Sequence, residues 1–164
     1  MSDVVFLDGT PAGSSHYPYI IAEMGHNHMG SLHEAKKLIS VAATAGVQAV
    51  KLQRRDNREL YTERFYNSPY NAENAYGPTY GTHRDYLELS PGDYFELQDY
   101  ADELGVTFIA TAFDLRSLDF LQKLDVPYFK IASGSIQNPL LLREVARLGK
   151  PVLASLGGAS DELV

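Results

Sequence analysis

The sequence predicts an α/β fold, and two observations support this prediction. Short apolar runs alternate with helical patterns, and the runs are apolar on both faces. Such strands belong to parallel sheets that helices cover. An open doubly wound sheet and a (β/α)8 TIM barrel both fit the alternation. A complete barrel needs about 250 residues. This chain of 164 residues offers about five strands, so we expect residues 1–164 to be the N-terminal part of a barrel domain, truncated after about its fifth strand.

The first third of the chain predicts a hairpin, a strand, a helix and a second strand. The stretch VVFLDG, residues 4–9, is expected to form a hairpin that closes the barrel floor. The β-branched run at residues 17–25 predicts the first strand of the sheet. Ser31 and the glutamate three residues after it have capping-box spacing, so a helix begins there. Gly46 is placed to end that helix, and the strand at residues 47–53 follows.

The middle of the chain is a long segment, residues 54–89, with little periodicity and many Tyr, Asn, Gly and Pro residues. It is too long for an ordinary connection, so we expect a substrate-binding loop or a flap packed against a neighbouring subunit. Its many aromatic rings argue against disorder. Ser90 as N-cap, Pro91 at the first helical position and Gly105 as the stop predict a helix after it.

The last third of the chain continues the alternation of strands and helices. The predicted elements are a strand at residues 106–114, a helix at 115–124, a strand at 126–133, a helix at 138–149, a strand at 150–158 and the onset of a helix at 160–162. This regular order is what a succession of β-α units produces.

Composition and charge exclude several classes of function. The formal net charge is −7, which argues against nonspecific nucleic-acid binding. The chain has no cysteine, so it has neither disulfides nor thiolate metal sites. The sequence contains no run of about 18 apolar residues, so it predicts no membrane span. The N-terminus lacks the pattern of a signal peptide. We therefore expect a cytoplasmic protein that binds no membrane.

Polar side chains stand where each predicted strand ends. In a parallel α/β protein these ends converge on one rim, where ligands bind. Lysine supplies a point charge for phosphate, and hydroxyls and turn amides supply directed donors. The sequence therefore predicts a cradle for a phosphate or carboxylate ligand. Its candidate residues are Lys51, Thr111, Lys130, Ser155 and the turn of residues 133–135, which begins at Ser133, while Glu23, Gln53 and Asp114 are the other polar residues at strand ends.

Two features near the first strand leave alternatives open. Glu23 is a candidate general acid or base, and a salt-bridged or capping carboxylate is the other interpretation. The stretch GHNHMG places His26 and His28 two residues apart, and this spacing alone does not make a metal site. We expect Asn27 and His28 to shape the loop or contact substrate. The other histidines, among them His83, are expected at the surface.

The strand-end motifs resemble those of N-acetylneuraminate (sialic acid) synthases. The matching stretches are IIAEMGHNHMGSLHEAKKLI, AVKLQ, FIATAFD, VPYFKIASGSI and GKPVLASLGG. The resemblance implies a (β/α)8 barrel that condenses phosphoenolpyruvate with N-acetylmannosamine or a related amino sugar. The products are a nine-carbon nonulosonic acid and phosphate. It also implies a divalent metal, Mn²⁺ or Mg²⁺, whose histidine ligands lie on later strands that these 164 residues do not include.

The resemblance also implies roles for individual residues. Those expected to hold phosphoenolpyruvate are Lys51, Thr111, Lys130, Ser133 and Ser155. Glu23 and Gln53 are expected to face the sugar, and an asparagine of the long segment, Asn71 or Asn74, to contact it. The sequence departs from the usual family pattern at residues 110–112 and 155–158, which leaves the exact substrate open.

Two other functions fit the sequence. One is a Schiff-base aldolase on a similar barrel, which needs a lysine with a depressed pKa. The other is a non-catalytic paralogue that binds a sugar or phosphate. A partial barrel leaves strand edges unpaired and an apolar interior open. We therefore expect the chain either to self-associate as a homo-oligomer (a dimer), for example with two chains completing each other's sheet, or to be poorly stable when isolated.

Overall fold

The computed structural model describes residues 4–157 and 159–160. Its centre is a five-stranded parallel sheet in the order β3-β4-β5-β6-β7, which follows the order of the chain. The strands are β3 (Ile21–Gly25), β4 (Ala49–Arg54), β5 (Thr107–Ala112), β6 (Phe129–Ile131) and β7 (Val152–Ala154). The predicted alternation of strands and helices is confirmed.

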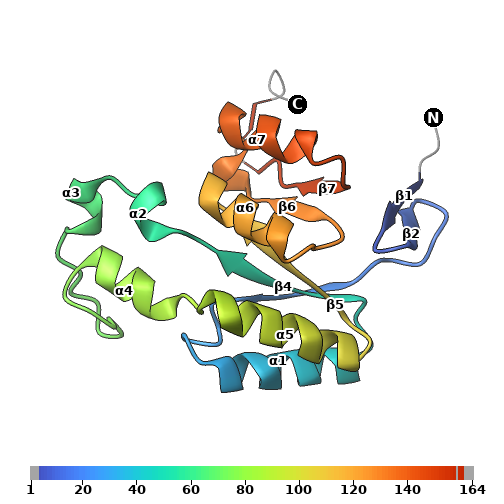
Figure 1. Ribbon diagram of the computed structural model, residues 1–164, viewed down its shortest axis with the longest axis horizontal. Coiled ribbons are helices and arrows are strands. Elements are labelled where there is room, and N and C mark those ends of the chain that lie inside the picture. The colour runs from blue at the N-terminus through green and yellow to red at the C-terminus, as the bar shows by residue number, and fades with distance from the viewer. Residues whose placement is uncertain (1–3, 158, 161–164) are drawn as a thin grey trace.

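Four longer helices follow the strands: α1 (Leu32–Thr44), α5 (Pro91–Glu103), α6 (Leu115–Lys123) and α7 (Pro139–Arg147). Helices α1 and α5 lie side by side along the sheet (Figure 1). The predicted caps at Ser31 and Ser90 are confirmed, since both side chains accept a backbone hydrogen bond. Of these two serines, Ser90 alone forms the reciprocal capping box. The Ser31 N–H donates instead to the His28 carbonyl at 2.9 Å, so the capping box expected there is incomplete.

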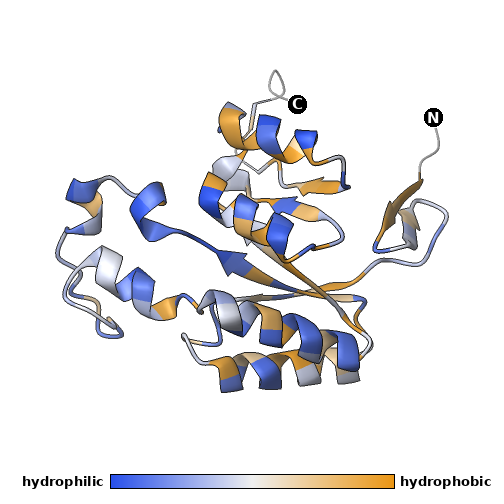
Figure 2. Ribbon diagram, viewed as in Figure 1, coloured by the Kyte–Doolittle hydropathy of each residue, from blue (hydrophilic) through white to orange (hydrophobic). Residues whose placement is uncertain are grey.

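The core lies between the sheet and these helices. Its largest fully buried side chains include Tyr94 and Leu97 of α5, Phe108 and Ile109 of β5, and Ile39 of α1. Figure 2 shows β1, β5 and β7 largely in hydrophobic colours, the arrowhead of β4 in hydrophilic colours, and the segment of residues 57–87 largely hydrophilic. Burial of the apolar faces therefore holds the sheet and its helices together, because each buried large side chain contributes about 1.5–3 kcal/mol.

The predicted N-terminal hairpin is confirmed as β1 (Val4–Leu7) paired antiparallel with β2 (Thr10–Gly13). It lies at the opposite end of the sheet from α2–α4 (Figure 1). The Asp8 carboxylate ties it there, accepting a hydrogen bond from Thr107 at 2.5 Å and another from the Tyr19 hydroxyl. Since Thr107 begins β5, the hairpin lies beside the amino-terminal end of that strand.

The segment of residues 54–89 differs from the sequence-based expectation. It was expected as a loop, and it contains three helices, α2 (Asn57–Leu60), α3 (Glu63–Tyr66) and α4 (Tyr80–Leu87). Each begins at a capping side chain, namely Asp56, Thr62 or Thr79. The first two helices have only four residues, so they show no apolar period in the sequence.

The sheet is open among the described residues, with β3 and β7 as its outer strands. A closed barrel and its truncation therefore stay predictions. The helix onset expected at residues 160–162 falls, after Ser160, outside the described residues. In the described part of the chain, no helix has both the length and the apolar character that crossing a membrane requires.

Candidate functional site

Strand register brings most of the predicted strand-end residues together. In the sheet, Glu23 is the partner of Lys51, and Thr111 is the partner of both Gln53 and Lys130. The three neighbouring strands β3, β4 and β5 therefore present these side chains at one rim, and β6 extends it. This is the edge at which parallel α/β sheets bind ligands.

Lys51 lies buried at the centre of this rim, with 7% of its surface exposed. Its Nζ donates to Thr111 Oγ1 at 3.2 Å and contacts the Glu23 carboxylate. Glu23 is half exposed, and its other oxygen accepts the Gly25 N–H at 3.1 Å. Of the two interpretations of Glu23, the salt-bridged carboxylate is present in the structure. It neutralises a lysine whose burial would otherwise be costly.

Lys130 differs from Lys51 because its Nζ contacts only neutral oxygens. It donates to Ser155 Oγ at 2.6 Å and to the Ile131 carbonyl at 2.5 Å. Within the residues that the structure describes, no carboxylate forms an ion pair with it. Burial and then the positive charge of Lys51 lower the pKa of Lys130 below its usual value, and Glu23 opposes them. The rim therefore holds two cations and one exposed carboxylate.

Ser133 begins a turn of 3-10 helix, residues Ser133–Ser135, directly after β6. Ser133 and Gly134 are exposed there. A Cβ at Gly157 would lie 3.5 Å from the Ser133 Cβ. The turn after β6 therefore stands against the residues that follow β7, next to Ser155. The predicted arrangement of a lysine, a hydroxyl and a serine turn is present at this end of the rim.

The residues predicted to face the sugar do not all lie at the rim. Gln53 lies on the rim, but its Oε1 accepts a hydrogen bond from Arg55 Nη2 at 2.6 Å. Asn71 and Asn74 are exposed between α3 and α4. Among the described residues, no hydrogen bond joins either asparagine to the rim. Asp114 caps α6 and accepts the Asp56 N–H at 2.8 Å, so its position is structural.

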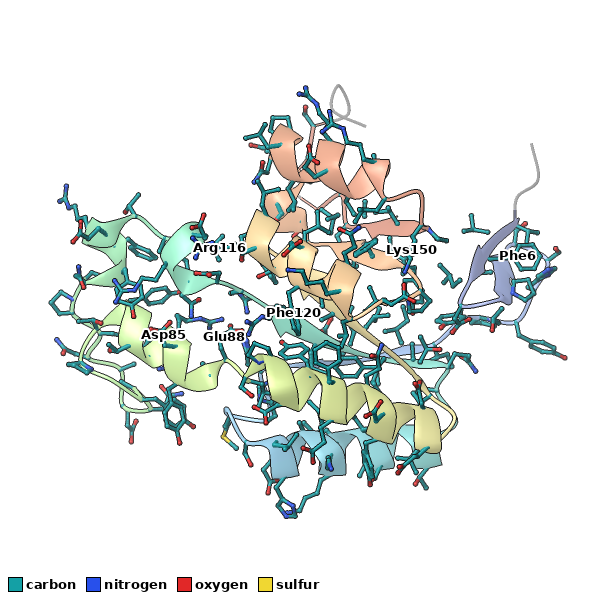
Figure 3. All side chains as sticks on the ribbon, in the orientation of Figure 1. Phe6, Asp85, Glu88, Arg116, Phe120 and Lys150 are labelled. Carbon is teal, nitrogen blue, oxygen red and sulfur yellow. The ribbon has the colours of Figure 1, made fainter. Side chains whose placement is uncertain are left out.

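A cationic cluster beside Gln53 was missed in the sequence. It consists of His26 after β3, Arg55 after β4, Arg84 of α4 and Glu88 at the end of α4. Figure 3 labels Glu88 where the α4 ribbon ends, close to β4. The adjacent residues Arg54 and Arg55, at the end of β4, were visible in the sequence. Their proximity to Arg84 depends on α4, a helix that the sequence did not predict.

The two histidines of the loop after β3, His26 and His28, belong to no group of metal-ligand spacing among the described residues. In the described part of the chain there is no group of three or more His, Asp or Glu side chains placed for a metal ion. His28 is 1% exposed, and its Nδ1 accepts the Gly30 N–H at 3.1 Å, so it shapes the loop as expected. His83 is also buried, and the prediction that it lies at the surface was wrong. Its Nδ1 accepts the Tyr76 N–H at 3.2 Å.

The sequence of this chain is similar to one protein family and to several known proteins. The model of the NeuB family matches residues 38–163. N-acetylneuraminate-9-phosphate synthase of Drosophila melanogaster is 45% identical over 139 residues, which are 85% of this chain and 37% of that protein. N,N'-diacetyllegionaminic acid synthase of Legionella pneumophila is 39% identical over 150 residues, covering 90% of this chain and 42% of that protein.

A solved structure extends the likeness to the fold. The N-acetylneuraminic acid (sialic acid) synthetase of Leptospira borgpetersenii matches with a TM-score of 0.84 and 29% identity. The match covers 99% of this chain and 53% of that one. The chain thus spans about two fifths of the length of the curated relatives just described.

Proposed function

Because the chain belongs to the NeuB family, we propose that it carries the phosphoenolpyruvate-binding half of a sialic-acid-type synthase and part of the sugar-binding half. In this proposal the enzyme, a transferase, condenses phosphoenolpyruvate with N-acetylmannosamine or a related amino sugar. It releases a nonulosonic acid and inorganic phosphate. The names of the Drosophila and Legionella relatives describe synthases of such acids.

The observation that carries the proposal is the pair of lysines on the rim. Lys130 contacts only neutral oxygens, and the charge of Lys51 adds to the burial that lowers its pKa. One ammonium group is paired with the exposed Glu23 carboxylate and the other contacts no carboxylate among the described residues, so the rim favours an incoming anion. Phosphoenolpyruvate brings a phosphate and a carboxylate, so it matches two separate cations. Thr111 and Ser155 already hold the two ammonium groups in place.

The proposed chemistry uses these side chains for charge and positioning. Carbon 3 of phosphoenolpyruvate forms a bond to the aldehyde carbon of the open-chain sugar, and water adds to carbon 2. The tetrahedral intermediate then expels phosphate and leaves a ketone. Lys51 and Lys130 stabilise the phosphate and carboxylate charges through these steps. Glu23 is proposed to move a proton of the sugar or of the attacking water.

Other parts of the proposal rest on the sequence and on the family likeness. They are a closed barrel, a homodimer, a cytoplasmic location and a divalent metal, Mn²⁺ or Mg²⁺. The described residues offer no group of three or more ligands for that metal. The residues present therefore do not fit it, and no step above depends on it. Ser133 and Gln53 are proposed to contact phosphoenolpyruvate and sugar, with Asn71 or Asn74 completing the sugar contacts.

The first test is the melting temperature with millimolar phosphoenolpyruvate. A ligand that binds only the folded state, at a hundred times its Kd, stabilises by about 2.7 kcal/mol. For a domain of this size that is roughly a 5–10 °C rise. We expect the rise in the wild type and in Lys37→Ala, whose lysine is exposed on α1. We expect Lys51→Ala and Lys130→Ala to lose it. A wild type without a shift, or a shift kept by both rim variants, contradicts the proposal.

The lowered pKa of Lys130 is the one observation that favours a Schiff-base aldolase instead. The two functions separate in a trapping experiment. An aldolase lysine forms an imine with pyruvate and releases water, and borohydride then reduces the imine to a stable secondary amine that keeps the pyruvate-derived mass on Lys130. We expect no such adduct, because the Lys130 ammonium is held by two oxygen acceptors. A non-catalytic paralogue predicts binding of phosphoenolpyruvate without release of phosphate when metal and amino sugars are added.

A further inference from the structure

Arg55, the residue that follows β4, is held in place from several sides. Its side chain is only 10% exposed. The guanidinium lies over the ring of Phe113, 3.9 Å from the centroid. Its Nη1 stands 3.2 Å from the ring nitrogens of His26, and its backbone N–H donates to Glu88 Oε2 at 3.3 Å. Because ring, edge and backbone are all engaged, the guanidinium has little freedom to turn.

The fixed guanidinium decides which end of the Gln53 carboxamide faces it. Arg55 Nη2 donates to Gln53 Oε1 at 2.6 Å. A guanidinium only donates hydrogen bonds, and so does the nitrogen of a carboxamide. The reversed carboxamide would therefore set two donors against each other. A hydrogen bond from a charged donor is also stronger than one between neutral groups, so the oxygen of Gln53 is committed to Arg55.

The nitrogen of Gln53 is left at the rim. A Cβ at Gly25 would lie 3.8 Å from Gln53 Nε2 and 3.8 Å from Glu23 Oε1. In the part of the chain that the structure describes, no acceptor receives a hydrogen bond from this nitrogen. The Glu23 carboxylate beside it is half exposed. The rim therefore presents a donor next to an acceptor, and a sugar hydroxyl can use both, since it donates and accepts.

A purely structural contact with Arg55 would not need a carboxamide at position 53. A carboxylate there would bind the guanidinium more strongly, because both partners would be charged. It would, however, offer only acceptors to the rim. What the carboxamide adds is a pair of N–H donors, and Arg55 directs them toward Gly25 by holding the oxygen.

We propose that Arg55 is a positioning residue, which fixes the Gln53 carboxamide so that it donates hydrogen bonds to an oxygen of the acceptor sugar. Arg55 itself does not contact the sugar and acts through Gln53. This inference rests on the proposed function, since it takes an amino sugar as the ligand beside the lysine cradle. The sugar must then bring a hydroxyl or carbonyl oxygen to this point of the rim.

NMR of the chain without ligand tests the positioning step. With ¹⁵N-labelled glutamine, the side-chain peaks that disappear in Gln53→Met belong to Gln53. We expect its Nε2 to show restricted motion on the picosecond to nanosecond scale. Gln48 gives the rigid reference, because its Oε1 accepts the Ile20 N–H at 2.7 Å. Gln122 is exposed and gives the mobile one. Arg55→Met should make Gln53 as mobile as Gln122, and Arg55→Lys, which can still donate, should restore part of the order.

Arg58→Met is the matched control for Arg55→Met. Arg58 also lies over an aromatic ring, 3.5 Å from the centroid of Tyr66, and it is exposed. It should leave the motion of Gln53 unchanged, as should every variant leave that of Gln48. A Gln53 that is mobile in the wild type, or equally ordered in Arg55→Met, overturns the inference. So does an equal loss of order in both arginine variants.

Calorimetric titration with N-acetylmannosamine, with and without saturating phosphoenolpyruvate, tests the donor role. Gln53→Glu keeps the contact with Arg55 but removes the donors, so we expect roughly tenfold to a hundredfold weaker binding. Arg55→Met should weaken binding about threefold to tenfold, because the sugar must then immobilise Gln53 itself. In the Gln53→Met background, Arg55→Met should have no further effect. A further loss there, or full affinity in Gln53→Glu, overturns the inference.

The outcomes separate this inference from the proposed function. Phosphoenolpyruvate binding in a chain whose Gln53 is mobile refutes the positioning role and leaves the synthase proposal standing. An ordered Gln53 in a wild type that does not bind N-acetylmannosamine also overturns the inference, because the donor then has no sugar to serve. Sugar binding that depends on Arg55 through Gln53, in a chain that does not bind phosphoenolpyruvate, refutes the synthase proposal and leaves the positioned donor.

Discussion

The sheet with its covering helices and the segment α2–α4 are held together by different forces. Side chains at the centre of the sheet, such as Val50, Leu52 and Ile109, are wholly buried and apolar. The segment relies on polar and aromatic contacts instead. Asp85 accepts hydrogen bonds from Tyr66 and from Asn57, the latter at 2.9 Å. A packed apolar layer tolerates loss of one contact better than a small polar network does.

The aromatic rings of the segment form a second, smaller centre of packing. The ring of Tyr80 lies 4.7 Å from Phe65, 5.2 Å from Tyr61 and 5.5 Å from Tyr70, measured between centroids. Each such pair contributes about 0.5–1.5 kcal/mol beyond burial. The comparison teaches that Lys51 and Lys130 are positioned by the sheet, which buried apolar side chains stabilise. The cationic cluster depends partly on the segment α2–α4, because Arg84 belongs to α4.

The largest expected effect comes from Gly81→Ala in α4. A Cβ at Gly81 would overlap the ring of Tyr66, which is itself buried. The ring cannot move without losing its hydrogen bond to Asp85. Overpacking of this kind costs about 3 kcal/mol. We expect amide hydrogen exchange to accelerate throughout residues 57–88 while protection of β4 and β5 persists.

Gly92→Ala is the matched control for this substitution. Gly92 also lies in a helix, α5, but its Cβ would meet nothing closer than Ser90 Oγ at 3.8 Å. Replacing an unstrained helical glycine by alanine stabilises by roughly 0.5–1 kcal/mol. If Gly81→Ala slowed or left unchanged the exchange of residues 57–88, the segment would not depend on close packing at α4.

The same contrast explains how much of the fold the sequence could predict. The caps at Ser31 and Ser90 and the glycines after α1, α5 and α7 are local patterns, so these long helices were placed correctly. The strand predicted at residues 126–133 was too long, because only Phe129–Ile131 pairs with neighbours. The helices α2 and α3 have four residues each and no apolar face, so nothing in their periodicity distinguished them from a loop.

The candidate site was predictable to the extent that strands position it. Lys51, Thr111 and Lys130 meet because the carboxyl ends of parallel strands converge. Arg55, Arg84 and His26 meet only through α4 and two connections, and their spacing in sequence carries no information about this contact. Asn71 and Asn74 were expected from the resemblance alone. The structure leaves both exposed.

The next effect concerns His28, which lies at the seam between the two regions. Burial, and then the neighbouring His26, lowers the pKa of His28 from 6.5 to about 4. The folded state therefore keeps His28 neutral where the unfolded state protonates it. Since the folded pKa is the lower one, stability is full above pH 6.5 and is lost as the pH falls toward 4. The loss attributable to His28 is about 2–3 kcal/mol.

Denaturant unfolding between pH 7 and pH 4 measures this loss. We expect His28→Gln to be less stable at pH 7 but to show a flatter dependence on pH than the wild type. His33→Gln is the control, since His33 is exposed on α1 and should leave the slope unchanged. An equal slope in the wild type and His28→Gln would assign the acid sensitivity to carboxylates alone.

The smallest expected effect compares the same interaction in both regions. Thr79 caps α4 and Ser90 caps α5, each through a reciprocal capping box. Removing either hydroxyl, by Thr79→Ala or Ser90→Ala, costs about 1 kcal/mol. Helix α5 has 13 residues and packs on the sheet, whereas α4 has 8 and packs mainly within the segment. We therefore expect Ser90→Ala to lower the free energy of global unfolding. Thr79→Ala should chiefly accelerate hydrogen exchange in residues 80–87 and leave global unfolding nearly unchanged. If both variants lowered global stability equally, the segment and the sheet would unfold as one cooperative unit. The two regions would then differ in the side chains that they contain but not in their stability.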